Sequence, residues 1–371
     1  MSQKNKISSG KFLSINCLLF SGVIQSFPSF ATLTAKIYMK TILDKKYETP
    51  SIITKALLYV NYLCRINYWR ITDFFAQRKT QTSKFFDLNS NFNVEFKENG
   101  FLHLHNVFPE ECIDKLVSSI QTSRKTLEKG RKPLGLHSGR IANLHAINKE
   151  VLNFLNDPVI QKIQRKLLNS EPILWGSLIF NKGSQQSLHA DAPFFYVEPY
   201  GAMIGMWIAL EDINPDAGPL CYIPQSHKKT ISVESAILDN LKLREEVDAF
   251  RELSVSASPR KFWDLSFAVS EEYSKKYASL EGAVQVCPKK GDVFFWHQWL
   301  VHGGSKINNG YLSRNSIVSH WVGDNSVAFD QHNFFLNYGK LDEKIKQILP
   351  INRFKNSKHI RQYKCQILNW D

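Results

Sequence analysis

The spacing of hydrophobic residues divides the chain into helical and strand-like parts. Three segments carry apolar residues at helical spacing: residues 50–80, 109–127 and 151–168. From Pro172 the period changes to two, which is typical of strands. Three short strand-like runs follow: residues 173–175, 177–180 and 203–210. Short strands separated by turn residues are typical of closed or double-sheet β architectures. The pattern therefore predicts a mainly β fold with flanking helices.

Two segments of the second half depart from this simple alternation. The run at residues 203–210 is apolar throughout, so we expect a strand that is buried on both faces. The strand pattern stops at residues 229–280, where the sequence is charged and helical. It resumes at residues 283–297. We interpret the break as a helical insertion between the two halves of a jelly roll, where it forms a lid or faces a substrate. A peripheral surface insertion is the alternative.

Charge is concentrated at the two ends of the chain. The 371 residues carry a net charge of +13, with twelve basic and three acidic residues in 1–80 and eight basic and three acidic residues in 340–371. The 27 basic and 28 acidic residues between these ends nearly balance, which argues against a core that binds a polyanion. The basic ends suit peripheral contact with a membrane or an acidic partner. Solvated charge on terminal helices is the plainer alternative.

Cysteine usage and the first residues bear on the compartment. Six cysteines are scattered without the spacing of zinc ribbons or disulfide frameworks: Cys17, Cys64, Cys112, Cys221, Cys287 and Cys365. This usage favours a reducing, cytoplasmic location. Residues 1–35 superficially resemble a signal peptide, but their apolar run is interrupted by polar residues and is too short to span a bilayer. Nucleic-acid-binding patterns, phosphate-binding loops and nucleophile elbows are absent from the sequence.

An H-x-D pair supplies the first candidate chemistry. His189 and Asp191 are separated by one residue, and residues i and i+2 of an extended segment point to the same side. Both side chains can therefore reach one metal ion. With a third imidazole they form the two-histidine, one-carboxylate triad that holds Fe(II) and leaves coordination positions open. His302 is the best third ligand, and His297 competes with it because each follows the strand ending in Trp296.

A second polar pair lies twelve residues after His302. Arg314 and Ser316 form an Arg-x-Ser pattern, which on a strand places a guanidinium and a hydroxyl on one face. Such a pair suits a buried carboxylate, and Arg314 can provide the cation for a dicarboxylate. His103 and His105 also have alternate spacing, but no partner motif accompanies them. We interpret them as residues of the first core strand.

Several segments resemble the phytanoyl-CoA dioxygenase family, and they follow the order found in that family. The matching segments are Phe96–Phe101 with Phe108–Glu111, Trp207–Asp212, Gly218–Leu220, Ile223–Lys228, and Gly291–His297 leading to His302–Ser305. The resemblance spans about residues 90–325. Within Ile223–Lys228 the chain has Gln225 where the family usually has glycine, which affects the local turn and not the chemistry.

The resemblance implies a double-stranded β-helix core, also called a jelly roll and cupin-like, and an oxidoreductase with an iron centre. It implies Fe(II) as the metal, with 2-oxoglutarate and O2 as co-substrates. His189, Asp191 and His302 would be the metal ligands. The Gly-Gly-Ser after His302 and its distance to Arg314 fit the family better than the surroundings of His297 do.

The resemblance also implies how the co-substrate binds and which reaction follows. Arg314 would pair with the distal carboxylate of 2-oxoglutarate, and Ser316 would add a hydroxyl donor. Trp207 would lie beside the co-substrate, with a plain core aromatic as the alternative reading. Relatives that halogenate lack the carboxylate ligand, so Asp191 indicates hydroxylation or a related oxidation. The substrate would be a small molecule or an acyl-type compound.

The organisation and function predicted from the sequence are as follows. Residues 1–85 form a basic, partly helical extension, residues 90–325 the dioxygenase domain, and residues 326–371 a basic tail that packs on or near it. The alternative function is a non-catalytic metal-binding relative of the same fold that acts as a binding or membrane-associated protein. The sequence does not select a substrate or an oligomeric state, because one fold hosts many substrates.

Overall fold

The computed structural model describes mainly residues between 92 and 329. The described residues are 92–129, 140–195, 197–229, 233–253, 259–278 and 282–329, with 338, 346–347, 351–354, 357–360 and 365–368. All of them belong to one unit, Lys79–Asp371. The predictions for the signal-like start, the helix at 50–80, the basic extension 1–85 and most of the tail lie outside these residues. Within the described part, no helix combines the length and apolar character needed to cross a membrane.

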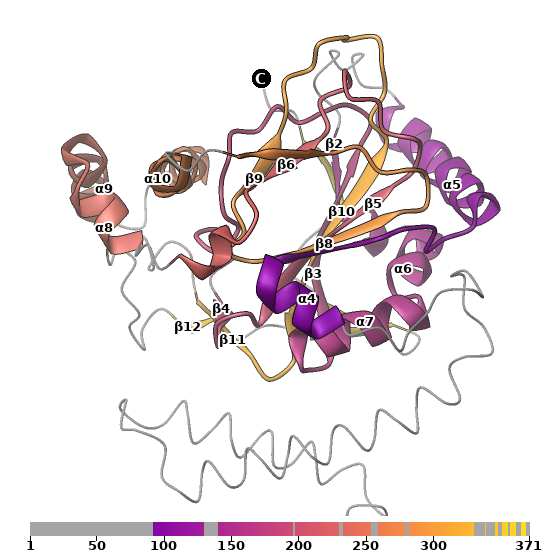
Figure 1. Ribbon diagram of the computed structural model, residues 1–371, viewed down its shortest axis with the longest axis horizontal. Helices are drawn as coiled ribbons and strands as arrows, with labels where there is room; N and C mark the ends of the chain where they lie inside the picture. The colour runs from indigo at the N-terminus through magenta and orange to yellow at the C-terminus, as the bar shows by residue number, and fades with distance from the viewer. Residues whose placement is uncertain are drawn as a thin grey trace, which may run out of the picture. The chain divides into compact units, whose positions relative to one another are not determined.

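The largest sheet forms the centre of the fold. Seven of its strands follow one another in this order: β1 (Phe101–Leu104), β8 (Val293–His297), β5 (Met203–Ala209), β10 (Ser316–Gly323), β3 (Pro172–Phe180), β14 (Ser357–Ile360) and β13 (Ile351–Phe354). Strand β2 (Arg140–Ala142) pairs with β3 and with β15 (Gln366–Leu368). Neighbours are antiparallel except β14 and β3. Segments far apart in sequence therefore lie side by side (Figure 1).

Two smaller sheets complete the β structure of the described residues. One has the order β7 (Val284–Val286), β6 (Leu220–Tyr222) and β9 (His302–Gly304). The other has the order β12 (Lys346–Gln347), β11 (Val327–Phe329) and β4 (Val197–Glu198). The β6 sheet packs against the large sheet through an apolar cluster that includes Leu220, Tyr222 and Phe294. This confirms the predicted mainly β fold with a double-sheet core.

Strand β5 shows how the large sheet separates two cores. All seven of its residues are buried, as its continuous apolar sequence predicts. Ile204 and Met206 point into the cluster shared with the helices, whereas Trp207 points into the cluster between the two sheets. Successive side chains of a strand alternate between faces, so one strand contributes to both cores.

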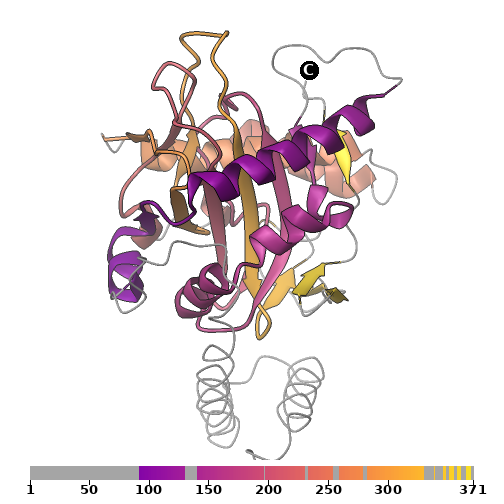
Figure 2. The ribbon, with the colours of Figure 1, turned by 90° about the vertical axis from the view of Figure 1, so that its right-hand side faces the viewer.

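Four helices cover the outer face of the large sheet: α4 (Phe92–Asn99), α5 (Glu110–Glu128), α6 (Lys149–Leu155) and α7 (Pro158–Leu168). Figure 2 shows the longest of them, α5, crossing the strands. The helical pattern at 151–168 belongs to two helices, because the chain breaks at Asp157–Pro158. Asp157 caps α7 by accepting hydrogen bonds from the backbone N–H groups of Val159 and Ile160. Pro158 disfavours a helical conformation at the residue before it.

Three further helices occupy the stretch 229–280: α8 (Val233–Leu238), α9 (Leu241–Leu253) and α10 (Pro259–Ala278). They share an apolar cluster with Ala190 and Val301. These two residues lie next to His189 and His302, and side chains alternate along extended backbone. The helices therefore pack behind the two histidines. This packing gives the helices a supporting position, and the lid role stays a prediction.

Gly205 is the position of β5 where a side chain has no room. A Cβ atom there would overlap the indole of Trp296, which is 2% exposed. We expect Gly205→Ala to lower the free energy of unfolding by about 1–3 kcal/mol, because the buried ring has to move. Urea unfolding followed by circular dichroism measures this change. Gly310→Ala is the matched control, because a Cβ at Gly310 meets nothing within 4 Å. Equal stability of the two variants would contradict the account.

Candidate metal centre

A backbone bridge brings the two halves of the H-x-D…H pattern together. The N–H of His189 donates to the carbonyl of His302, and the N–H of His302 donates to the carbonyl of His189, both at 2.8 Å. The two imidazole rings lie side by side, with centroids 4.5 Å apart. Asp191 follows in a turn, where its carbonyl accepts hydrogen bonds from Phe194 and Phe195. Its side chain returns to the same side as the two rings.

The donor atoms of the three side chains face one point. Nε2 of His189 lies 3.9 Å and Nε2 of His302 lies 3.7 Å from Oδ1 of Asp191. The three donor atoms lie within 4.8 Å of one another, and all three residues are buried. The structure thus brings together the three residues that the sequence predicts as metal ligands.

The hydrogen bonds of the two Nδ1 atoms fix which ring nitrogens face the carboxylate of Asp191. Nδ1 of His189 lies 2.8 Å from the carbonyl of Ser187, and Nδ1 of His302 lies 2.9 Å from the carbonyl of Leu300. A carbonyl only accepts hydrogen bonds, so each Nδ1 carries the proton. Each Nε2 then presents a lone pair toward Asp191, which is the tautomer that binds a metal. The amide of Gln186 lies 3.1 Å from Nε2 of His189.

Electrostatics also leave His189 and Asp191 in the state that binds a cation. Burial, with the neighbouring His302, lowers the pKa of His189 to about 4, so its imidazole is neutral at pH 7. Burial alone would raise the pKa of Asp191, but His302, His320 and His189 hold it below its usual value. Two imidazoles and one carboxylate form a donor set that suits a divalent transition metal.

Two residues that sequence reasoning missed hold the second oxygen of Asp191. The indole N–H of Trp296 donates to Oδ2 at 2.7 Å, and Nε2 of His320 lies 3.4 Å from the same atom. In the strand register, Trp296 and His320 both lie opposite Gly205 on the strand between them. A glycine inside an otherwise apolar strand marks a close approach of this kind. Gly205 was therefore the feature of the sequence that could have pointed to a close approach at this position.

His297, the competing ligand, lies elsewhere. Its ring packs against Phe96, Tyr200 and His227 near α4. Burial lowers the pKa of His297 to about 3, and its Nδ1 accepts a hydrogen bond from the N–H of Trp299. The structure therefore places His302, and not His297, with the H-x-D pair.

The Arg-x-Ser pair lies in a second buried polar region. Arg314 is 3% exposed, and its guanidinium lies over the rings of Phe180 and Trp207, 5.2 and 5.8 Å from their centroids. Burial and the nearby Arg140 lower the pKa of Arg314 to about 10, so it keeps its charge at pH 7. Arg140, another residue that the sequence did not single out, stacks on Phe180 at 5.0 Å.

Three buried donors in this region have no hydrogen-bond partner among the described residues. They are Nε of Arg314, Oγ of Ser316 and Nε1 of Trp207. A buried polar group without a partner costs about 1–3 kcal/mol, and such groups in a native structure call for a bound acceptor. Trp207 shares an apolar cluster with Trp296, whose ring lies 4.9 Å from that of His302. The region around Arg314 and the candidate metal centre thus join through two tryptophans.

Gln225 departs from the family pattern without disturbing the turn. It adopts φ +59°, a left-handed conformation that favours glycine. The following short helix, η2 (Ser226–Lys228), forms normally, and the ring of His227 contacts the carbonyl of Lys97. His227 is therefore a turn residue in contact with α4.

Comparison with known proteins assigns the chain to a family. The model of the phytanoyl-CoA dioxygenase (PhyH) family matches residues 96–316. The chain belongs to the phytanoyl-CoA dioxygenase family. The family match includes His189, Asp191, His302, Arg314 and Ser316.

Individual relatives from the phytanoyl-CoA dioxygenase family match smaller parts of the chain. Phytanoyl-CoA dioxygenase domain-containing protein 1 of Mus musculus is 36% identical over 93 residues, covering 24% of this chain and 32% of the relative. The chain therefore spans about a third of that protein. Phytanoyl-CoA dioxygenase, peroxisomal, of Homo sapiens is 23% identical over 252 residues, covering 61% of this chain and 66% of the relative. Among solved structures, the non-heme alpha ketoglutarate dependent carbocyclase SnoK from nogalamycin biosynthesis has a TM-score of 0.48 at 18% identity, covering 68% of this chain and 88% of SnoK.

The tryptophan that holds Asp191 gives a first test of this PhyH site. Trp296→Phe removes the N–H donor and leaves Oδ2 of Asp191 with the longer contact to His320 alone. We expect the affinity for Mn(II) or Co(II) to fall about tenfold, the effect typical of partners behind metal ligands. Calorimetric titration measures the dissociation constant. Trp321→Phe is the matched control, because Trp321 donates to Ser319 in the cluster shared with the helices. An unchanged affinity in Trp296→Phe would refute the positioning role.

Proposed function

We propose that this chain is an Fe(II)/2-oxoglutarate-dependent dioxygenase that hydroxylates a small-molecule or acyl-type substrate. One observation carries the proposal. A buried His–Asp–His donor set is connected through Trp296 and Trp207 to a buried guanidinium with unpartnered donors around it. The first suits Fe(II), and the second suits the distal carboxylate of a keto-diacid. Membership in the phytanoyl-CoA dioxygenase family supports the same reading.

The residues present fit both groups. His189, Asp191 and His302 would hold the iron on one face, which leaves the remaining positions for the keto-acid end and for oxygen. Bound ferrous iron would supply the oxygen chemistry that couples decarboxylation of 2-oxoglutarate, to succinate and CO2, with oxidation of the substrate.

The chain's own side chains would orient the ligands and exclude water. With Oδ2 held by Trp296, Asp191 would bind through Oδ1 alone, and this keeps coordination positions open. Arg314 would pair with the distal carboxylate, with Ser316 and Trp207 donating to it. The rings of Phe180 and Trp207 next to the guanidinium keep that charge in a dry environment, where the ion pair is strong.

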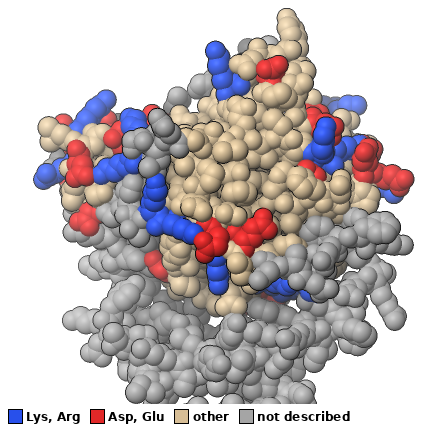
Figure 3. Space-filling view, viewed as in Figure 1, with Lys and Arg blue, Asp and Glu red and all other residues tan. Residues whose placement is uncertain are grey.

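The charge of the described surface bears on the substrate class. Figure 3 shows basic and acidic side chains interspersed around a face whose centre carries neither. Several lysines of the described residues form ion pairs, such as Lys228 with Glu98 and Lys290 with Asp114. On this face of the described residues, Lys and Arg do not gather into a patch that would bind a carrier rich in phosphate. We therefore favour a substrate of low charge.

The carboxylate ligand gives the direct test of catalysis. We expect Asp191→Asn to lower succinate formation from 2-oxoglutarate at least a hundredfold, because the substitution removes the charge that holds Fe(II) while keeping the shape. Succinate is measured by mass spectrometry in the uncoupled reaction, so no substrate is needed. Asp212→Asn is the control, since Asp212 is an exposed partner of Lys289. Full turnover by Asp191→Asn would exclude the proposed iron ligand.

The guanidinium gives a test specific to the co-substrate. Arg314→Gln leaves the distal carboxylate buried and unpaired, a cost on the order of 2–5 kcal/mol. We expect the 2-oxoglutarate concentration for half-maximal succinate formation to rise at least about thirtyfold, with iron affinity unchanged. Arg165→Gln is the control, because Arg165 pairs with Glu171 instead. A loss of iron binding in Arg314→Gln, or no change in the 2-oxoglutarate requirement, would contradict the assignment.

A further inference from the structure

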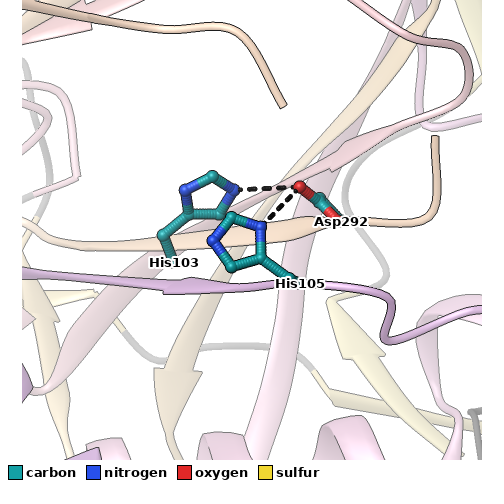
Figure 4. Close-up of side chains that lie close together, drawn as sticks. All are labelled: His103, His105 and Asp292. Atoms are coloured by element: carbon teal, nitrogen blue, oxygen red, sulfur yellow. Dashed lines mark hydrogen bonds and ion pairs between the residues drawn. The ribbon is translucent and has the colours of Figure 1, made fainter. Parts of the chain in front are cut away.

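A second cluster of metal-binding side chains lies at the edge of the large sheet. His103 belongs to β1, and His105 is the residue directly after the end of this strand. Asp292 immediately precedes β8, the strand that pairs with β1. Leu104 is opposite Val293 in the register, so Asp292 comes next to His105. Figure 4 shows both imidazoles facing the carboxylate of Asp292.

The three side chains converge on one oxygen. Nδ1 of His105 lies 2.9 Å and Nε2 of His103 lies 3.3 Å from Oδ2 of Asp292. All three donor atoms lie within 4.8 Å of one another. The ring centroids of the two histidines are 4.2 Å apart. These separations are near the roughly 3.3 Å between ligands of a tetrahedral ion with bonds of about 2.0 Å.

The environment of Asp292 fixes its orientation and its charge. Oδ1 accepts a hydrogen bond from the backbone N–H of Asn106, so Oδ2 is the oxygen that faces the imidazoles. Oδ2 also accepts a hydrogen bond from the N–H of Lys289. Burial alone would raise the pKa of Asp292, but contacts with the two imidazoles and with these N–H groups lower it to about 2. The group is an oriented carboxylate at every physiological pH.

One contact of the cluster is weak. Nε2 of His103 is buried, and it lies 3.3 Å from Oδ2 of Asp292 as an ion-pair contact without a hydrogen bond. Nδ1 of His105 is closer to the same oxygen, at 2.9 Å. A cation between the three groups would be bound by all three donor atoms. The side chain of His105 is 67% exposed, so water can complete the coordination of such an ion.

We propose that His103, His105 and Asp292 bind a divalent transition metal ion, with Zn²⁺ as the ion of choice. Two imidazole nitrogens and one carboxylate oxygen are common zinc ligands, and water would occupy the fourth position. Nε2 of His103, Nδ1 of His105 and Oδ2 of Asp292 are the ligand atoms. On binding, the Nδ1 proton of His105 moves to the exposed Nε2, and the ion replaces the hydrogen bond to Asp292.

The position of the site indicates a structural role. Strand β1 has four residues and lies at the edge of the large sheet. An ion held by β1 and by the entrance to β8 would tie this edge to the strand that carries Trp296. The ion would thus stabilise the fold without contacting the ligands of the first centre, and this proposal does not depend on the proposed catalytic function.

Counting metal ions in a set of variants tests the proposal. The chelator-treated protein is incubated with Zn²⁺, desalted and analysed by mass spectrometry for bound metal. We expect two equivalents in the wild type and one in the double variant Asp191→Ala/His302→Ala. Adding His105→Asn to the double variant should remove the remaining equivalent. The asparagine amide can still donate to Asp292, so this variant keeps the hydrogen bond and loses the ligand. His103→Gln is an independent second variant.

Thermal unfolding provides a readout that does not depend on stoichiometry. Zn²⁺ should raise the melting temperature of Asp191→Ala/His302→Ala by several degrees and leave that of the His105→Asn triple variant unchanged. A wild type that binds one equivalent, lost in the double variant, would overturn the proposal. The proposal would also be overturned if a second equivalent of Zn²⁺ remained bound in both the His105→Asn and the His103→Gln variants. One equivalent that only His105→Asn removes would support this site and count against the first centre.

Discussion

The pair of backbone hydrogen bonds between His189 and His302 is the constraint on which the metal centre depends. These residues are separated by more than a hundred positions, yet the bridge fixes their rings 4.5 Å apart. It also connects the segment that carries Asp191 to β9 of the small sheet. The helices α8–α10 pack on Ala190 and Val301, the residues behind the two ligands, and this apolar support holds the bridge in place. This backbone bridge between distant parts of the sequence brings the donor atoms together.

A second constraint acts through the absence of a side chain. Gly205 leaves space on β5 that the indole of Trp296 fills from β8, and His320 approaches from β10 on the other side. Both reach Oδ2 of Asp191, which leaves Oδ1 to face the imidazoles. The same sheet carries Trp207 and Ser316, whose unpartnered donors lie in the region of Arg314. One sheet therefore orients Asp191 and carries the buried donors near Arg314 that have no partner among the described residues.

Features set by neighbouring residues could be predicted from the sequence, whereas features set by strand register could not. The period of two predicted the β core, and the i, i+2 spacing placed His189 with Asp191 and Arg314 with Ser316. Trp296 and His320 were missed because their common target depends on which residues lie opposite Gly205. The same limit applies to His103 and His105. Their partner Asp292 lies 187 positions from His105 and becomes a neighbour only when β1 pairs with β8. The position of α8–α10 behind the ligands likewise follows from tertiary packing.

The central claim, that one site holds both Fe(II) and 2-oxoglutarate, is tested most directly by anaerobic spectroscopy. Metal-free protein is titrated with Fe(II) and then with 2-oxoglutarate, and the visible spectrum is followed. Chelation of ferrous iron by the keto acid should produce a weak visible absorption band in the wild type. His302→Ala should lose this band, and His297→Gln should retain it, because His297 packs beside α4 and away from the donor set. A wild-type protein that binds iron without developing the band, or a band that persists in His302→Ala, would contradict the account.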